Sequence, residues 1–189
     1  MHIVGVIIHG NPDKRYFFVV YPHLAGDSNL NVECIRLALH QYCKETGLRP
    51  NLYVVVDNAS DNKSRWVLGS LAWLVAQGKV NQVELSMLPV GHTHEDIDQA
   101  FRIIANALIR AGFVGTIEQY MEIIATAWTG ERQYVQVISA VFDYKQWLTG
   151  VVWETARTKD DSVNVLKHLK KNRYFKIAKR TLDGATCLW

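Results

Sequence analysis

The stretch LYVVVD, residues 52–57, decides the class of fold. It is a run of β-branched residues with almost no polar alternation, and such a strand is typical of a parallel sheet that is covered on both faces. A buried helix is expected next, over residues 60–77, because the segment LGSLAWLVA is apolar on nearly all sides. Another strand is expected over residues 83–90. This order predicts two parallel strands, adjacent or one apart, joined by a helical crossover.

The flanking segments extend the pattern in both directions. Residues 1–21 are expected to form a two-stranded hairpin, and a helix should run from Asp27 or Ser28 to Thr46, where Gly47 provides a stop. The further predicted elements are helices over 94–110, 116–128 and 143–148, a strand over 134–141, and a hairpin over 174–189. The resulting order, β-β-α-β-α-β-α and a mixed tail, predicts an α/β fold.

The composition indicates a folded core and excludes several classes of protein. The chain has 189 residues, of which 49% are hydrophobic, and this fits one domain with an appendage. We expect a core over residues 1–150 and an extension over residues 151–189. No apolar run reaches the roughly 18 residues of a membrane span, so no membrane partner is expected. Three cysteines without CxxC spacing indicate reduced thiols inside the cell.

Polar side chains follow the strand 52–57 directly, in the segment DNASDNKSR. The carboxyl end of a strand is where open α/β sheets bind their ligands, so Asp57 is a candidate metal ligand. The residues that could position a phosphate here are Asn58, Asn62, Lys63 and Arg65. An Asp-Asn turn followed by helix-capping residues explains the same segment without any ligand.

A second polar cluster, GHTHEDID over residues 91–98, follows the next strand and opens the next helix. Its imidazoles and carboxylates suit a divalent metal, and carboxylate-rich sites favour Mg²⁺ or Mn²⁺. Helix capping is the alternative, with Thr93 as the N-cap and the Asp96 side chain bonded to the Thr93 backbone amide. Capping leaves both histidines and Asp98 unexplained. The candidate ligands of this cluster are His92, His94, Asp96 and Asp98.

The two polar clusters are expected to converge on one crevice, because the carboxyl ends of parallel strands face the same side of a sheet. Asp57 would then hold the metal together with Asp98 or Asp96. Asp98 is preferred because capping already accounts for Asp96. His92 and His94 could ligate the metal or move protons near a leaving oxygen.

The stretch over residues 52–101 resembles an uncharacterised domain family of eukaryotic, often transposon-associated proteins. That family is typified by an L-Q-x-D-N segment, an E-N-K-N-R-Y segment and the string G-H-T-H-x-D-x-D-Q. The similarity extends to VIIHG at residues 6–10, to DSN at residues 27–29 and to the D-x-x-x-W-L string at residues 143–148, and it covers most of residues 1–150. The departures from the commoner residues are Ala59, Asp61 and Ser64.

The order of elements also resembles the ribonuclease-H-like fold of DDE transposases and integrases, a mixed sheet flanked by helices. The resemblance implies that Asp57 is the second of three metal-binding acids, and that the third is Glu95, Asp96 or Asp98. The hairpin over residues 1–21 would be the second and third strands of that fold, and neither of its strands contains an acid. The strand with the first acid is therefore expected upstream of Met1, and without it a two-metal centre is incomplete.

The second polar cluster also resembles a different metal motif. The string His92-x-His94-x-Asp96 matches the first part of the HxHxDH motif of metallo-β-lactamase-type hydrolases. The sixth position is Ile97 instead of histidine, and His168 is the only later histidine. A metal-dependent hydrolase of a small substrate is therefore the third choice.

The charge of the chain is unevenly distributed. Residues 151–189 hold nine Lys and Arg against four Asp and Glu, a net +5, whereas residues 1–150 carry a net −2. Aromatic residues interleave with the Lys and Arg residues. This pattern favours binding of phosphates by the charged side chains and stacking of nucleobases on the rings, although a solvated hairpin surface explains the same pattern. The candidate nucleic-acid-binding bases of this tail are Lys167, Lys170, Lys171, Arg173 and Lys176.

Together these features favour a transposase-like or integrase-like domain that acts on nucleic-acid phosphodiesters with Mg²⁺ or Mn²⁺. DNA is the expected partner, the nucleus the expected location, and a homo-oligomer is left open. The alternative is a non-catalytic module, domesticated from a transposable element, that binds nucleic acid or protein. Whether the chain is an enzyme depends on the acidic first strand.

Overall fold

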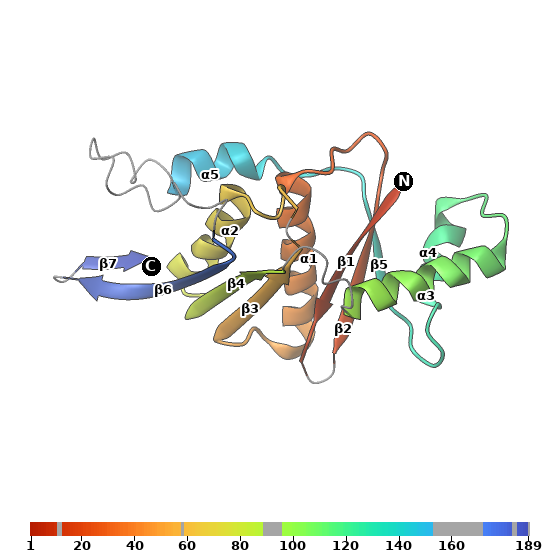
Figure 1. Cartoon of the computed structure of the whole chain (residues 1–189), viewed down its shortest axis with the longest axis horizontal. Helices are drawn as coiled ribbons and strands as arrows, with labels where there is room; N and C mark the ends of the chain where they lie inside the picture. The colour runs from red at the N-terminus through yellow and green to blue at the C-terminus, as the bar shows by residue number, and fades with distance from the viewer. Residues whose placement is uncertain (11–12, 58, 89–95, 153–171, 183–184, 189) are drawn as a thin grey trace. The chain divides into compact units, whose positions relative to one another are not determined.

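The computed structural model describes residues 1–189 except 11–12, 58, 89–95, 153–171, 183–184 and 189 (Figure 1). The chain divides into two compact units. The first unit comprises Met1–Ala25, Cys34–Glu45 and Gly91–Val141, and the second comprises Gly26–Glu33, Thr46–Val90 and Phe142–Trp189. Helix α1 (Ser28–Thr46) supplies residues to both units.

A three-stranded sheet with the order β1-β2-β5 forms the first unit. Strands β1 (His2–Ile8) and β2 (Lys14–Val20) pair antiparallel, which confirms the predicted hairpin. Strand β5 (Tyr134–Ile138) pairs parallel with β2. The central strand β2 is almost fully buried from Tyr16 to Val20 because it lies between two other strands and is apolar at both sets of alternating positions.

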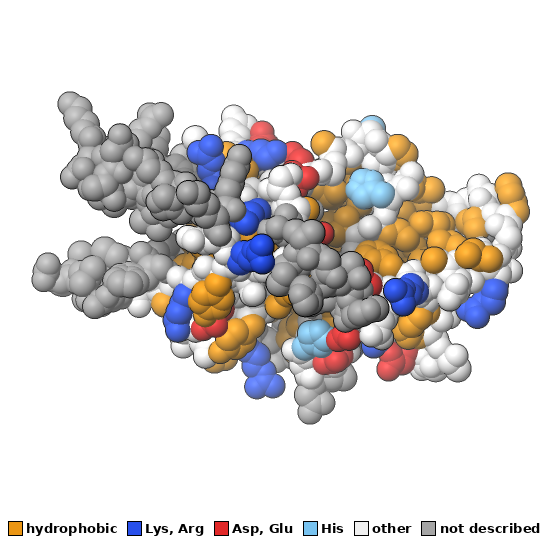
Figure 2. All heavy atoms as spheres, viewed as in Figure 1, with side chains coloured by type: hydrophobic (Ala, Val, Ile, Leu, Met, Phe, Trp, Pro, Cys, Tyr) orange, Lys and Arg blue, Asp and Glu red, His pale blue; other side chains and the backbone are white. Residues whose placement is uncertain are grey.

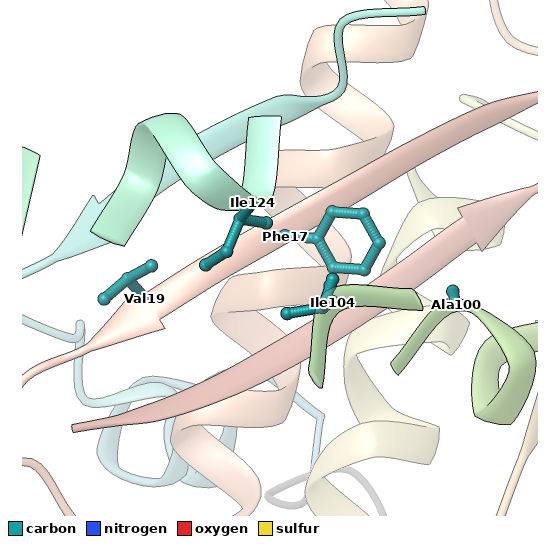
Figure 3. Close-up of a cluster of buried hydrophobic side chains, with 5 residues drawn as sticks. All are labelled: Phe17, Val19, Ala100, Ile104 and Ile124. Atoms are coloured by element: carbon teal, nitrogen blue, oxygen red, sulfur yellow. The ribbon is translucent and has the colours of Figure 1, made fainter. Parts of the chain in front are cut away.

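Helices α3 (Asp96–Ala111) and α4 (Ile117–Ala125) pack on this sheet. The buried cluster between them joins side chains of β2, α3 and α4: Phe17, Val19, Ala100, Ile104 and Ile124 (Figure 3). Helix α4 begins as predicted, since the Gln119 amide donates to the Thr116 hydroxyl at 3.2 Å. Helix α3 approaches β1 closely at Gly5, where an added Cβ would lie 2.6 Å from Cδ1 of Ile97 and would make that side chain shift.

The second unit is built on a four-stranded sheet with the order β3-β4-β6-β7. Strands β3 (Asn51–Val56) and β4 (Gln82–Met87) pair parallel and in register, as the sequence predicts. Strand β6 (Tyr174–Leu182) pairs antiparallel with β4 and forms the predicted hairpin with β7 (Ala185–Leu188). The C-terminal hairpin thus continues the sheet of the central strands.

Helix α2 (Arg65–Ala76) packs against this sheet, and α5 (Tyr144–Val152) packs against α2. Val83 and Leu85 of β4 and Val67 and Leu71 of α2 are at most 1% exposed. The prediction that this helix begins at residue 60 is wrong. It begins after Ser64, whose hydroxyl caps it by accepting from the Val67 amide at 3.2 Å.

Strand β3 corrects a second prediction, because it is not buried on both faces. Tyr53 is 67% exposed and Val55 is 55% exposed, whereas the alternating positions Leu52, Val54 and Val56 are partly buried. Apolar residues stand at both sets of positions, so the sequence pattern could not reveal that one face of this strand is open. One side of β3 therefore exposes two large apolar side chains, Tyr53 and Val55.

The α/β class of the fold is confirmed by the alternation of strands and helices in both units. Among the described residues, every helix is too short or too polar to cross a membrane. Among the described residues, Cys34 and Cys43 take part in no disulfide.

Candidate functional site

The predicted site residues fall in different parts of the structure. Asp57 lies at the carboxyl end of β3 in the second unit, whereas Asp96 and Asp98 lie in the first turn of α3 in the first unit. Their predicted convergence therefore stays a prediction. The predicted residues that lie outside the described part of the chain are Asn58, His92, His94, Lys167, Lys170 and Lys171.

The Asp57 carboxylate is held in a defined orientation. Its Oδ1 accepts hydrogen bonds from the Ala59 backbone amide at 2.9 Å and from Nδ2 of Asn62 at 2.6 Å. The first bond forms the Asx turn that the Asp-Asn pair predicts. Asp57 is nevertheless exposed to solvent. The side chain is thus both fixed and accessible.

Asn62 connects Asp57 to helix α1. While Nδ2 of Asn62 donates to Asp57, its Oδ1 accepts from Nδ2 of Asn31 at 2.8 Å. Beside this contact, the Ser28 hydroxyl donates to the Asp61 carbonyl oxygen at 3.0 Å. Because both ends of the Asn62 amide are engaged, the loop after β3 is held against the first turns of α1.

A second set of contacts fixes the start of α1 against the start of α5. Asp27 caps α1 by accepting from the backbone amides of Asn29 at 2.9 Å and Leu30 at 3.3 Å, and it forms an ion pair with Lys145. Asn29 accepts from the Lys145 backbone amide at 3.0 Å and donates to Oδ1 of Asp143 at 3.3 Å. The same Asp143 oxygen accepts from the Gln146 amide at the first turn of α5.

The ionisation of Asp27 reflects these contacts. Partial burial raises the pKa of this carboxyl. The hydrogen bond and charge of Lys145, together with the backbone amides of Leu30 and Asn29, lower the pKa by more than burial raises it. The net result is a pKa below the ordinary value of an aspartate. Asp27 therefore stays ionised and keeps its ion pair at neutral pH.

These contacts form one polar relay from α5 through α1 to Asp57. We use the name Asp57 relay for its members: Asp27, Ser28, Asn29, Asn31, Asp57, Asp61, Asn62, Asp143 and Lys145. From sequence, Asp27 or Ser28 of the DSN string at 27–29 was expected only to cap a helix, and the D-x-x-x-W-L string at 143–148 had no role assigned. The structure confirms the cap at Asp27 and brings both strings into the relay. The available signal was that each string spans the start of a helix and contains more polar residues than one N-cap requires.

The acidic residues of the first unit lie in a different environment, beside a histidine. Nε2 of His9 lies 3.6 Å from Oδ2 of Asp96, and its Nδ1 lies 3.3 Å from Oδ2 of Asp13. All three side chains are at least half exposed. Sequence reasoning missed His9, although it belongs to the VIIHG string. In the part of the chain that the structure describes, no group of three or more His, Cys, Asp or Glu is placed to hold a metal ion.

The described basic candidates are engaged with neighbouring side chains or exposed. The Arg65 guanidinium lies over the ring of Trp66, 5.2 Å from its centroid. Lys176 on β6 pairs with Glu84 on β4 at 3.5 Å, and Arg173 is exposed at the start of β6. Lys63 is partly buried and its backbone amide donates to the Ala59 carbonyl oxygen at 3.0 Å. Lys63 and Arg65 thus lie in and next to the loop that carries Asp57.

Comparison with known families now places the chain. Residues 1–183 match the family described as a domain of unknown function, DUF7869. The chain belongs to this family. The DUF7869 match spans both units and includes the Asp57 relay, the acids of α3 and the strand β6. Neither the comparison with curated proteins nor the comparison with solved structures gave a match.

Proposed function

We propose that this DUF7869 domain is a transposase-like or integrase-like domain that acts on nucleic-acid phosphodiesters with Mg²⁺ or Mn²⁺. A ribonuclease-H-like arrangement of its strands and a transposon origin are part of the proposal. The observation that carries it is the Asp57 carboxylate, which is exposed and oriented at the carboxyl end of a parallel strand pair. Loops at this edge of an α/β sheet are where ligands bind.

The hydrogen bonds of Asp57 support a role as a metal ligand. Both of its bonds to described residues go to Oδ1, so Oδ2 is the oxygen that we propose for a cation. Oxygen ligands from carboxylates are what Mg²⁺ and Mn²⁺ prefer. The Asn62 amide, itself held by Asn31, restricts the carboxylate before any metal arrives, and outer contacts of this kind raise metal affinity.

The remaining candidate ligands are proposed from the sequence alone. They are Asp98 or Asp96, with His92 and His94. Strands β1 and β2 carry no acid within their bounds, His2–Ile8 and Lys14–Val20. Two-metal phosphoryl chemistry needs shared carboxylates, so catalysis is proposed only when a further acidic strand is supplied.

Titration of the protein with Mn²⁺ by calorimetry tests the proposal. The informative variant is Asp57→Asn, because its amide oxygen can still accept the bond from the Ala59 amide while the negative charge is lost. We expect Asp57→Asn to weaken Mn²⁺ binding at least tenfold, since ligand loss has at least the effect of losing an outer contact. The matched control is Glu118→Gln, an exposed acid of α4 that should bind as the wild type does. Equal binding by wild type and Asp57→Asn, or no binding by either, refutes the metal site.

A non-catalytic binding module is the second candidate, and one observation favours it. The bonds from Ala59 and Asn62 form a complete turn around Asp57 without any ligand. In that case Asp57→Asn would leave both nucleic-acid affinity and Mn²⁺ affinity unchanged. The same two variants therefore decide between the candidates.

A further inference from the structure

Strand β3 lies at one edge of its sheet, and its outer side carries backbone groups that β4 does not use. In the sheet order β3-β4-β6-β7, β3 pairs only with β4. The Val56 carbonyl oxygen accepts from the Leu88 amide at 3.1 Å, so Val56 turns its backbone groups toward β4. Since these groups alternate in direction along a strand, those of Tyr53 and Val55 point away from β4. Among the described strands, none pairs with this outer side.

The outer side of β3 lacks the features that keep edge strands apart. Charged residues, prolines and bulges commonly block such an edge, whereas β3 has the sequence NLYVVV and pairs with β4 in unbroken register. Tyr53 is 67% exposed and Val55 is 55% exposed, and Figure 2 shows hydrophobic side chains at the surface in the region of β3 and β4. The edge strands of the first sheet, β1 and β5, contain no exposed large hydrophobic side chain. The edge of β3 is therefore suited to pair with another extended strand.

The sequence of β3 is complementary to itself when two copies run antiparallel. A twofold axis at Val54 places Tyr53 opposite Val55 of the partner subunit and Val55 opposite the partner subunit's Tyr53. Each of these opposed pairs exchanges both of its N–H···O bonds, through the backbone groups that point away from β4. An aromatic residue directly opposite a β-branched residue also stabilises antiparallel strands.

The remaining positions of this register are compatible with the pairing. On the other side of the strand, Val54 lies opposite its own copy, and Leu52 lies opposite Val56 of the partner subunit, so that apolar side chains meet. These three residues are partly buried in the single chain, and the pairing would bury them further. At the end of the strand, Asp57 lies opposite Asn51 of the partner subunit. Like charges, which destabilise opposed strands, therefore do not face each other in this register.

We propose that two copies of this chain form a dimer by antiparallel pairing of β3 about Val54, which joins their sheets into one continuous sheet. The interface is isologous, because each subunit presents the same strand to the other. The proposal goes beyond the function proposed above and does not rest on the metal site, since the pairing uses the backbone of β3 and needs no cation.

Sedimentation velocity of the full chain over a range of concentrations, with EDTA in the buffer, tests the dimer. The wild type should show a reversible equilibrium between monomer and dimer. The double variant Tyr53→Lys, Val55→Lys places like charges directly opposite each other, and it should raise the dissociation constant of the dimer at least about tenfold. The double variant Tyr53→Glu, Val55→Glu should have the same effect. An equimolar mixture of the two variants should dimerise again, because opposite charges then face each other.

Two control variants separate edge pairing from other contacts. Tyr174 lies on the same face of the sheet as Val55, since both lie opposite Ser86, but it belongs to the interior strand β6 and is 55% exposed. Tyr174→Lys should therefore leave the dimer unchanged, whereas it would weaken a dimer held by stacking of two sheet faces. Phe113→Lys, at a side chain 91% exposed in the first unit, should also leave the dimer unchanged.

Disulfide cross-linking tests the register. In an opposed pair without hydrogen bonds the Cα atoms lie about 4.5 Å apart, which a disulfide can span. Val54→Cys should therefore cross-link to its own copy under mild oxidation. Tyr53→Cys should not, because the two copies of this residue lie on a diagonal of about 7–8 Å. The wild type is the control for the three native cysteines.

Three results in sedimentation would overturn the proposal. They are a wild type that stays monomeric up to about 0.1 mM, lysine and glutamate variants that dimerise as tightly as wild type, and a mixture of these variants that stays monomeric. Weakening of the dimer by Tyr174→Lys would also overturn it, because the contact would then involve the face of the sheet. Cross-linking of Tyr53→Cys in preference to Val54→Cys would refute the register. Circular dichroism spectra that match the wild type confirm that each variant is folded.

Discussion

The substitution Asn62→Ala removes the central link of the Asp57 relay. The Asn62 amide makes two hydrogen bonds, one to Oδ1 of Asp57 at 2.6 Å and one from Nδ2 of Asn31 at 2.8 Å. A bond to a charged group contributes about 1.5–3 kcal/mol and a neutral one about 1 kcal/mol. Because Asp57 is exposed, water replaces part of the first bond, so we expect a loss of about 2 kcal/mol in the free energy of unfolding.

Urea denaturation followed by circular dichroism and tryptophan fluorescence measures this loss. Trp73 and Trp147, whose rings meet edge to face with centroids 5.2 Å apart, report on the second unit. Asn31→Ala removes only the second bond and should cost about 1 kcal/mol. Since both residues belong to one network, the double variant should lose less than the sum of the single variants.

The reasoning about the relay would be refuted by two results. One is an Asn62→Ala variant whose free energy of unfolding lies within about 0.5 kcal/mol of wild type, the range of ordinary surface substitutions. The other is strict additivity of Asn31→Ala and Asn62→Ala, which would mean that the two amides do not act through each other.

Three further predictions concern the packing and the pH dependence. Gly5→Ala should cost about 1–3 kcal/mol because its Cβ meets Ile97, whereas the control Gly26→Ala, with nothing within 4 Å, should cost less than about 1 kcal/mol in the same denaturation assay. Leu71→Ala, at a site 1% exposed, should cost about 2–5 kcal/mol by urea denaturation, and a smaller loss would contradict the packing of α2. Since the pKa of Asp27 is lowered in the folded chain, its contribution is complete above the unfolded value of about 3.9 and is lost as the pH falls through the folded value. Lys145→Met should therefore lower the free energy of unfolding at pH 7. Below the folded pKa of Asp27, the variant and wild type should have the same free energy of unfolding, and a difference that persists there would contradict the ion pair.

Local patterns in the sequence predict the elements of the fold well. The parallel pair β3 and β4 follows from two apolar strands separated by a buried helix, and both hairpins follow from their turn residues. The pairing of β6 with β4 is not predictable in this way, because it joins residues about 90 positions apart and no local pattern specifies the partner strand.

The candidate site is less accessible to sequence reasoning. Asp57 could be singled out because a charge at the end of an apolar strand is unusual. The relay could not, because Asn31 and Asn62 meet only after α1 has packed beside the loop that follows β3. The contact between His9 and Asp96 likewise depends on the approach of α3 to β1, which Gly5 permits. The exposed face of β3 was missed since its residues are as apolar as buried ones.

The central claim is that Asp57 binds a divalent cation, and a crystal structure of the protein grown with Mn²⁺ tests it most directly. The account predicts an anomalous peak about 2.0–2.2 Å from Oδ2 of Asp57, with Oδ1 still bound to Asn62. A structure in which no Mn²⁺ lies at Asp57, and in which both carboxylate oxygens accept hydrogen bonds only from the turn residues and from water, would contradict the account.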